Sequence, residues 1–110
     1  MTDLAHQKCV PCEGGTLPLT REQFSAYLPQ VTDWQIEGDK SLSRQFEFKN
    51  FRTAMGFVTQ VGLLAEKEGH HPDIYLRDYK FVIITFSTHA IGGLSINDFV
   101  MAVKINEIMV

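Results

Sequence analysis

The chain contains few of the features that would place it in a specialised class of protein. Its 110 residues include only two cysteines, one tryptophan and four prolines. Both cysteines, Cys9 and Cys12, lie near the N-terminus, and we expect them to stay reduced. With 45% hydrophobic residues, a chain of this length can bury a core without disulfides or metals. One ordinary globular domain is therefore expected.

Long apolar runs and basic runs are also missing. No stretch approaches the roughly 18 apolar residues of a membrane span. Residues 1–10 lack the charged start and apolar run of a secretory signal. No block of lysine and arginine is present, and the net charge is -3, so a nucleic-acid partner is not expected. We therefore expect a cytoplasmic protein without a membrane or nucleic-acid partner.

Local patterns predict seven elements in the order α-β-β-α-β-β-α. These are a helix from Thr20 to about Leu28, a hairpin over 34–48, a helix from Asn50 to Gly69, a hairpin over 74–88 and a helix from Ser95. Hairpins that alternate with helices predict an α+β fold, an antiparallel four-stranded sheet with helices packed on one face. Residues 1–18, which have no periodicity, are expected to form an extended arm before a single domain over 19–110.

Capping patterns mark where the helices begin. Thr20 with Gln23, and Ser95 with Asp98, have the spacing of capping boxes. Asn50 can cap the middle helix, whose expected inward residues are Phe51, Ala54, Met55, Val58, Val61 and Ala65.

Two glycines, Gly56 and Gly62, interrupt the middle helix. Each costs about 1 kcal/mol relative to alanine. They are either a tolerated weakness or a sign that another backbone approaches closely, within the fold or across a dimer. The sequence leaves both readings open.

The histidines carry the strongest functional signal. His70 and His71 are adjacent, and Pro72 favours an extended conformation at His71. If the second hairpin turns at residues 79–80, the numbers of paired residues sum to 159, and His70 lies opposite His89. A slip of one residue would change the partner but still bring these histidines to one end of the sheet. Histidine exchanges protons near neutral pH, so this convergence predicts acid–base chemistry.

A metal site at these histidines is not expected. Adjacent residues of an extended chain point to opposite faces, so His70 and His71 are poorly placed to bind one ion. A second candidate is His6, Cys9 and Cys12, but structural zinc sites use four ligands. The alternative is that these three residues bind no metal and belong to a flexible arm.

The spacing of these residues matches a known pattern. The pattern consists of Glu66, His70-His71-Pro72, Tyr79, His89 and Asp98, with Ser87-Thr88-His89 and Gly93-Leu94-Ser95 as a second block. It resembles the signature of the pterin-4a-carbinolamine dehydratase family, and the similarity runs from about Leu17 to Ile108. Tyr79 departs from it, since this position is often tryptophan.

The resemblance implies a lyase activity, that of a 4a-hydroxytetrahydrobiopterin dehydratase. Such an enzyme removes water from 4a-hydroxytetrahydropterin to give quinonoid dihydropterin. It thereby recycles the cofactor of aromatic amino-acid hydroxylases and needs no metal or organic cofactor. The glycine-bearing middle helix favours self-association, and we expect a homo-oligomer, either a dimer or a tetramer. The alternative is a dimerisation cofactor without essential catalysis, because some animal relatives assist a homeodomain transcription factor.

Roles for single residues follow from the resemblance as expectations. His70 and His89 are expected to donate protons on either side of the pterin, and His71 to orient the ring or accept a proton. Glu66 is expected to support a histidine or contact the pterin, unless it is merely solvated. Asp98 is explained by capping alone, so its loss should harm stability before chemistry. The expected substrate contacts are His70, His71, Pro72, Thr88, His89, Ala90 and Ile91.

Overall fold

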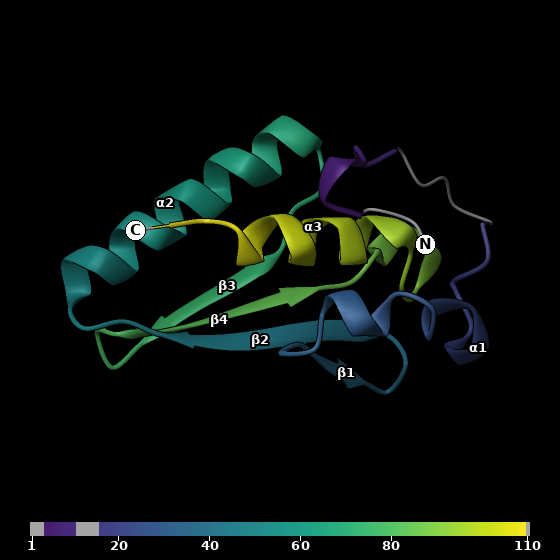
Figure 1. Cartoon of the computed structure of the whole chain (residues 1–110), viewed down its shortest axis with the longest axis horizontal. Coiled ribbons are helices and arrows are strands. Elements are labelled where there is room, and N and C mark those ends of the chain that lie inside the picture. The colour runs from purple at the N-terminus through teal and green to yellow at the C-terminus, as the bar shows by residue number, and fades with distance from the viewer. Residues whose placement is uncertain (1–3, 11–15, 110) are drawn as a thin grey trace.

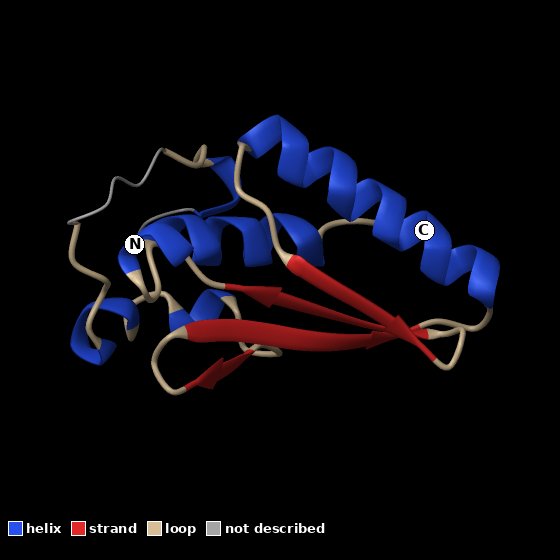
Figure 2. Cartoon of the chain, turned by 180° about the vertical axis from the view of Figure 1, so that it is seen from behind, coloured by secondary structure: helices blue, strands red, loops and turns tan. Residues whose placement is uncertain are grey.

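The computed structural model describes residues 4–10 and 16–109. It confirms the α+β fold and the predicted order of elements (Figure 1, Figure 2). The strands are β1 Gln35–Glu37, β2 Ser41–Glu47, β3 Asp73–Arg77 and β4 Phe81–Phe86. The α-helices are α1 Arg21–Phe24, α2 Phe51–Glu68 and α3 Ile96–Asn106. Short 3₁₀ helices span Leu4–His6, Leu28–Gln30 and His89–Ile91.

The four strands form one antiparallel sheet in the order β1-β2-β4-β3. Strand β4 is therefore central, as its apolar residues on both sides predict. Helices α2 and α3 cover the same face of this sheet (Figure 1, Figure 2). The core lies between these layers and includes the fully buried Leu42, Val82, Ile84, Phe86, Phe99 and Met101. At the end of the sheet where β4 stops, loops follow the strand, and these loops form the candidate site.

The first helix is shorter than predicted. Its capping box is present, since Thr20 accepts a hydrogen bond from the Gln23 backbone and the Gln23 side chain accepts one from Thr20. However, α1 ends at Phe24 instead of near Leu28. The Tyr27 and Leu28 N–H groups donate to carbonyls three residues back, so the chain tightens into 3₁₀ geometry.

The second hairpin has a different register from the one expected. Asp73 pairs with Thr85 and Arg77 with Phe81, so the paired numbers sum to 158 and not 159. The loop has three residues, and Asp78 and Tyr79 adopt positive φ angles of 49° and 57°. These conformations were not evident from the residue types, which are not glycine. In addition, β3 begins only at Asp73 and β4 ends at Phe86, so His70 and His89 lie beyond the paired strands. The predicted direct opposition is therefore wrong.

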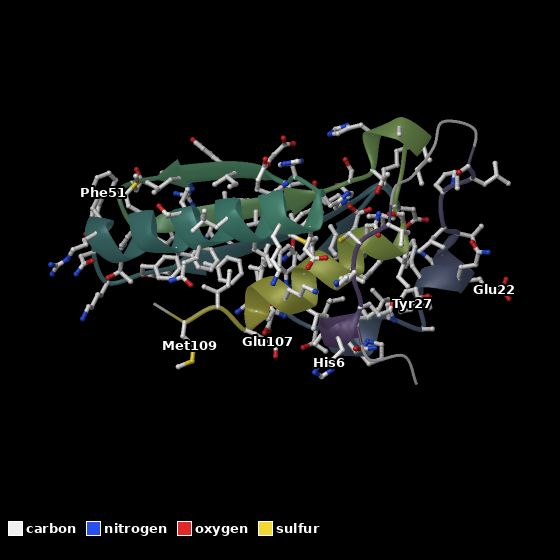
Figure 3. The ribbon with its side chains drawn as sticks, turned by 90° about the horizontal axis from the view of Figure 1, so that it is seen from above. His6, Glu22, Tyr27, Phe51, Glu107 and Met109 are labelled. Atoms are coloured by element: carbon white, nitrogen blue, oxygen red, sulfur yellow. The ribbon has the colours of Figure 1, made fainter. Side chains whose placement is uncertain are left out.

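Helix α2 has the predicted ends but a narrower inward face. Asn50 accepts a hydrogen bond from the Thr53 N–H, and Gly69 adopts the left-handed conformation that ends the helix. Ala54, Phe57, Val61 and Ala65 are buried, and Val58 is partly buried. Phe51 and Met55, expected to face inward, are exposed; Figure 3 shows Phe51 at the outer end of the helix.

The two glycines of α2 have open space around them. A Cβ atom added to Gly56 or Gly62 would meet nothing within 4 Å. Within residues 4–10 and 16–109, close approach of another backbone is therefore excluded as the reason for either glycine. Two explanations for these glycines remain: a tolerated loss of helix stability, or a close contact with a second copy of the chain. No helix in the described part of the chain is long and apolar enough to cross a membrane.

The N-terminal arm packs against the domain in its described part. Residues Leu4–His6 form a 3₁₀ turn, so the arm is not extended throughout. Leu4 is fully buried, and its N–H lies 3.3 Å from Oε1 of Gln30. In Figure 1 this segment, in purple, lies beside α3 and the C-terminal end of α2. The arm therefore contributes to the core.

Candidate active site

The first histidine of the pair lies just after the end of α2. Gly69 turns the chain with φ 70°, and the His70 ring then reaches β4. The ring stacks on Phe86 with centroids 5.7 Å apart and an angle of 9° between the planes. Its Nε2 atom lies 2.6 Å from Oδ1 of Asp98, and the side chain is 12% exposed. His70 is thus held by an aromatic ring and by a carboxylate.

Asp98 does more than cap α3. Its carboxylate is fully buried, and Oδ2 accepts hydrogen bonds from the Ser95 N–H at 2.9 Å and the Thr88 hydroxyl at 2.8 Å. The first bond belongs to the predicted capping box, which is confirmed. Oδ1 is left for His70. Capping alone is therefore an incomplete explanation of this residue.

These contacts determine where the hydrogens lie. An ionised carboxylate only accepts hydrogen bonds, so Nε2 of His70 carries a hydrogen and donates it to Asp98. Thr88 gives its single hydroxyl hydrogen to Asp98, so the Ser95 hydroxyl, 2.8 Å away, donates to Thr88. The remaining nitrogen of the His70 ring, Nδ1, is then the one that can exchange a proton with a ligand.

The second histidine is in a wetter environment. Nε2 of His71 lies 2.8 Å from Oε1 of Glu66, on the last turn of α2. Both side chains are exposed, His71 by 63% and Glu66 by 81%. Exposed pairs of this kind are individually weak. Glu66 therefore contacts one of the site histidines, and this histidine is His71.

The third histidine lies on a loop that folds back on itself. His89 begins the 3₁₀ helix that follows β4, and Gly92 ends it with a positive φ of 69°. The Thr88 N–H donates to the Gly93 carbonyl at 2.7 Å, which closes the loop. A Cβ atom on Gly93 would lie 2.7 Å from Cβ of Pro18, so only glycine fits there without movement. This close packing keeps His89 at the end of the sheet.

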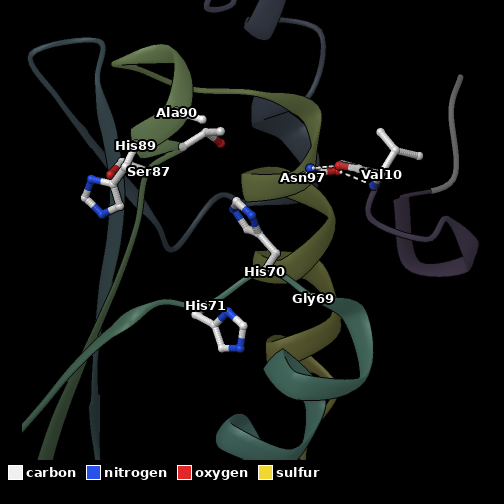
Figure 4. Close-up of a pocket in the computed structure, with 9 residues that line it drawn as sticks. Val10, Gly69, His70, His71, Ser87, His89, Ala90 and Asn97 are labelled. Carbon is white, nitrogen blue, oxygen red and sulfur yellow. Dashed lines mark hydrogen bonds between the residues drawn. The ribbon is translucent and has the colours of Figure 1, made fainter. Parts of the chain in front are cut away.

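The three histidines line one cavity of about 390 Å³ (Figure 4). A cavity of this size suits a small bicyclic ligand. Its lining residues are Val10, Gly69, His70, His71, Ser87, Thr88, His89, Ala90 and Asn97.

The cavity includes most, but not all, of the expected substrate contacts. Ile91 lines a neighbouring, more apolar cavity, and Pro72 does not line the cavity of the histidines. Val10 and Asn97 were not expected there. In the sequence, Asn97 is simply the second residue of a helix capped by Ser95, and Val10 lies in an arm without periodicity. The sequence contains no local signal for either residue.

A buried ion pair lies beneath the arm. Oε2 of Glu68 is 3.0 Å from Nζ of Lys104, and Oε1 accepts a hydrogen bond from the Cys9 N–H at 3.0 Å. The Glu68 side chain is only 6% exposed. The Cys9 N–H, and secondarily the Lys104 ammonium, lower the pKa of Glu68 below its ordinary value, although burial opposes the shift. This pair ties the arm to α2 and α3.

The lowered pKa of Glu68 predicts acid-sensitive stability. The folded state binds this proton more weakly than the unfolded state, so the Glu68 charge stabilises the fold above the ordinary pKa of about 4.5. That contribution should disappear as the pH falls through the lowered folded pKa. In urea unfolding from pH 7 to about pH 3, the stability advantage over Glu68→Gln should therefore shrink at the acid end. Glu107→Gln, at an exposed glutamate, is the control, and an advantage that persisted to pH 3 would contradict the assignment.

Only two of the three candidate metal ligands in the arm, His6 and Cys9, belong to the described residues. Among the described residues no group of three histidine, cysteine or acidic side chains is placed to hold a metal ion. Cys12 lies outside the described residues, so the His6, Cys9 and Cys12 alternative stays a prediction.

The sequence matches a known family and known proteins over nearly its whole length. A family model described as pterin 4 alpha carbinolamine dehydratase matches residues 17–108. A protein of Alkaliphilus metalliredigens, with the provisional name pterin-4-alpha-carbinolamine dehydratase, is 46% identical over 108 residues. That match covers 97% of this chain and 96% of the relative. A protein of Rubrobacter xylanophilus with the same provisional name is 43% identical, and the match covers 98% of this chain and all of the relative.

Solved structures agree with these matches. The crystal structure of a transcriptional coactivator/pterin dehydratase from Brucella melitensis is similar with a TM-score of 0.74 and 38% identity. The match covers 81% of this chain and 95% of that one. A pterin dehydratase-like protein described as a RuBisCO assembly factor in the alpha-carboxysome has a TM-score of 0.58 at 20% identity, which shows the fold alone. The chain therefore belongs to the pterin-4a-carbinolamine dehydratase family, a family of hydro-lyases.

Proposed function

We propose that this protein dehydrates 4a-hydroxytetrahydropterin to quinonoid dihydropterin. The observation that supports this most strongly is the meeting of His70, His71 and His89 on one cavity. The buried Asp98 behind His70 adds a fixed carboxylate to this group. Family membership supplies the reaction class, and these side chains supply groups that can carry it out.

The proposed reaction consists of a bond cleavage and two proton transfers. The bond between C4a and its hydroxyl oxygen breaks, water leaves, and a C=N double bond forms to the adjacent ring nitrogen. Hydroxide is a poor leaving group, so an acid must protonate the oxygen while a base takes the proton of that nitrogen. Each well-placed proton transfer contributes about 10²–10⁴-fold to the rate. Imidazoles are suited to both transfers at neutral pH.

The residues can be given roles within this proposal. His70 and His89, on either side of the ring, are the candidates for the acid that protonates the hydroxyl oxygen. His71 either takes the proton of the ring nitrogen or orients the ring, in which case the histidine that is not the acid takes that proton. Asp98 accepts Nε2–H of His70, so His70 exchanges its proton through Nδ1. Glu66 holds the exposed His71 ring by its hydrogen bond. Thr88 and Ala90, beside His89, complete the wall of the cavity.

The direct test uses the reactive substrate. An aromatic amino-acid hydroxylase generates 4a-hydroxytetrahydropterin, and its ultraviolet decay is followed with and without the purified protein. Acceleration of the decay is the expected result, and it would establish the dehydration step on which recycling of the hydroxylase cofactor depends. If the decay rate stays at its uncatalysed value, the proposed reaction is wrong.

Self-association is the second part of the proposal. Three large apolar side chains of α2 are exposed, Phe51 by 52%, Met55 by 44% and Leu63 by 68%. Exposed apolar groups gathered on one element are typical of an interface. We expect a dimer or a tetramer that buries this face, with Gly56 and Gly62 close to the second copy.

A charge on this face should separate the copies. Leu63→Glu is expected to lower the mass measured by sedimentation equilibrium, because a buried unpaired carboxylate destabilises an apolar interface. Leu17→Glu introduces the same charge at an 85% exposed leucine outside α2 and should leave the mass unchanged. Equal masses for the wild type and Leu63→Glu would exclude this face as the interface.

The exposed face of α2 also favours a second candidate, an interaction protein without essential catalysis. The Brucella melitensis relative is described as both a coactivator and a dehydratase. The two functions depend on different residues. A binding function should survive His70→Ala combined with His89→Ala, whereas dehydratase activity should not.

A further inference from the structure

Val10 is an exposed apolar residue at the wall of the histidine cavity. Its side chain is 57% exposed, yet it lines the same cavity as His70 and His89. In the view of Figure 4, Val10 and Asn97 lie on one side of His70 and His89 lies on the other. A ligand that filled the cavity from His89 past His70 would reach this wall, and covering the apolar surface of Val10 would remove it from water and favour binding.

Asn97 holds the backbone of Val10 at this wall. The Val10 N–H donates to Oδ1 of Asn97 at 2.9 Å, and Nδ2 of Asn97 donates to the Val10 carbonyl at 2.5 Å. The asparagine is only 2% exposed. One buried side chain thus binds both backbone polar groups of one exposed residue. Water could satisfy the backbone N–H and carbonyl of an exposed residue, so Val10 does not need Asn97 merely to satisfy its backbone hydrogen bonds.

The neighbouring residues of the arm are attached as well. Cys9 donates its N–H to the buried Glu68, two residues before His70. Leu4 is inserted into the core at the other end of the described arm segment. Val10 therefore follows a chain that is held at several points, so its position is defined before any ligand binds. Such preorganisation lowers the entropic cost of binding.

The first turn of α3 connects this wall to the acid–base group. Asn97 binds Val10, and the next residue, Asp98, binds His70. The same turn therefore orients an apolar wall and an imidazole toward one cavity. We propose that Val10 is a substrate-contacting residue of the dehydratase site and that Asn97 is the residue that positions it. This inference rests on the function proposed above, since it assumes that the ligand is a pterin.

Two substitutions test the contact and its support separately. Val10→Ala removes the apolar surface and keeps both backbone hydrogen bonds, whereas Asn97→Ala removes the bonds and keeps the valine. We expect Val10→Ala to raise KM about fivefold and Asn97→Ala to raise it about tenfold, with kcat changed less than twofold. The same rise should appear in the Kd for 7,8-dihydropterin, measured by calorimetry without turnover.

Asn106→Ala is the matched control. Asn106 lies at the other end of α3, and its Oδ1 accepts hydrogen bonds from Trp34 and Arg44 at 2.9 and 2.7 Å. Both this variant and Asn97→Ala should lose thermal stability, but Asn106→Ala should keep the wild-type KM and Kd. A merely structural role for Asn97 would give the two variants the same result.

The outcomes separate this inference from the proposed reaction. If the wild type binds dihydropterin and accelerates dehydration, but the folded Val10→Ala and Asn97→Ala variants keep its KM and Kd, the arm is no part of the site. If the wild type binds dihydropterin without dehydrating the substrate, the reaction is wrong, and weaker binding by the two variants still supports the wall. If the wild type neither binds nor reacts, both proposals are overturned.

Discussion

Replacing His70 or His89 with alanine is expected to lower kcat for dehydration of 4a-hydroxytetrahydropterin about 10²–10⁴-fold. Each substitution removes a group that can transfer a proton on one side of the cavity. The double variant should fall to the uncatalysed rate of decay. The measurement is the ultraviolet decay of the substrate at saturating concentration, with circular dichroism to show that each variant is folded.

His71→Ala separates the two roles left open for this residue. If His71 accepts a proton, its loss should lower kcat as much as the loss of His70. If it only orients the ring, KM should rise and kcat should change little. His6→Ala is the control, because the His6 side chain is exposed and does not line the cavity. A folded His70→Ala variant that kept more than a tenth of the wild-type kcat would refute the role of His70.

Asp98→Asn is expected to lower both stability and activity. Oδ2 of Asp98 accepts two hydrogen bonds, from Thr88 and Ser95, so the carbonyl oxygen of the new amide should take this position. The NH₂ group then faces His70 and forces Nε2 to accept a hydrogen bond instead of donating one. The ring hydrogen moves to Nδ1, and His70 is fixed in a tautomer that can neither accept a proton at Nδ1 nor become the imidazolium that donates from it.

The expected size of the two effects follows from these contacts. A mismatched buried hydrogen-bond group costs about 1–3 kcal/mol of the free energy of unfolding. The wrong tautomer should lower kcat by about 10²-fold or more. Urea unfolding measures the first effect, and substrate decay combined with nitrogen NMR of His70 measures the second. Asp33→Asn, at an exposed carboxylate, should change neither.

A result confined to stability would restore the simpler view of Asp98. If Asp98→Asn unfolds more easily but keeps the wild-type kcat and the Nε2–H tautomer of His70, the residue is only a helix cap. That was the expectation from the spacing of Ser95 and Asp98 alone. The buried contact with His70 is the reason to expect more.

The order of the elements and the starts of the helices were predictable from local sequence patterns alone, whereas the end of α1 was not. Capping boxes at Thr20 and Ser95, the cap at Asn50 and the left-handed Gly69 were all predictable and are all present. These features depend on residues within four or five positions of one another, so the local chain contains all the necessary information. The α+β order followed from them, as did the grouping of the histidines at one end of the sheet.

The register of the second hairpin and the partners of the site residues depend on contacts between distant segments of the chain. The second hairpin shifted by one residue because Asp78 and Tyr79 adopt positive φ angles that their residue types do not require. The pairing of His70 with Asp98 joins residues 28 positions apart, and that of Val10 with Asn97 joins residues 87 positions apart. No local pattern specifies such pairs. They form because the arm, α2 and α3 pack on one sheet and bring these residues together. The polar side chains of Asn97 and Asp98 are buried there, and a buried polar group needs a hydrogen-bond partner.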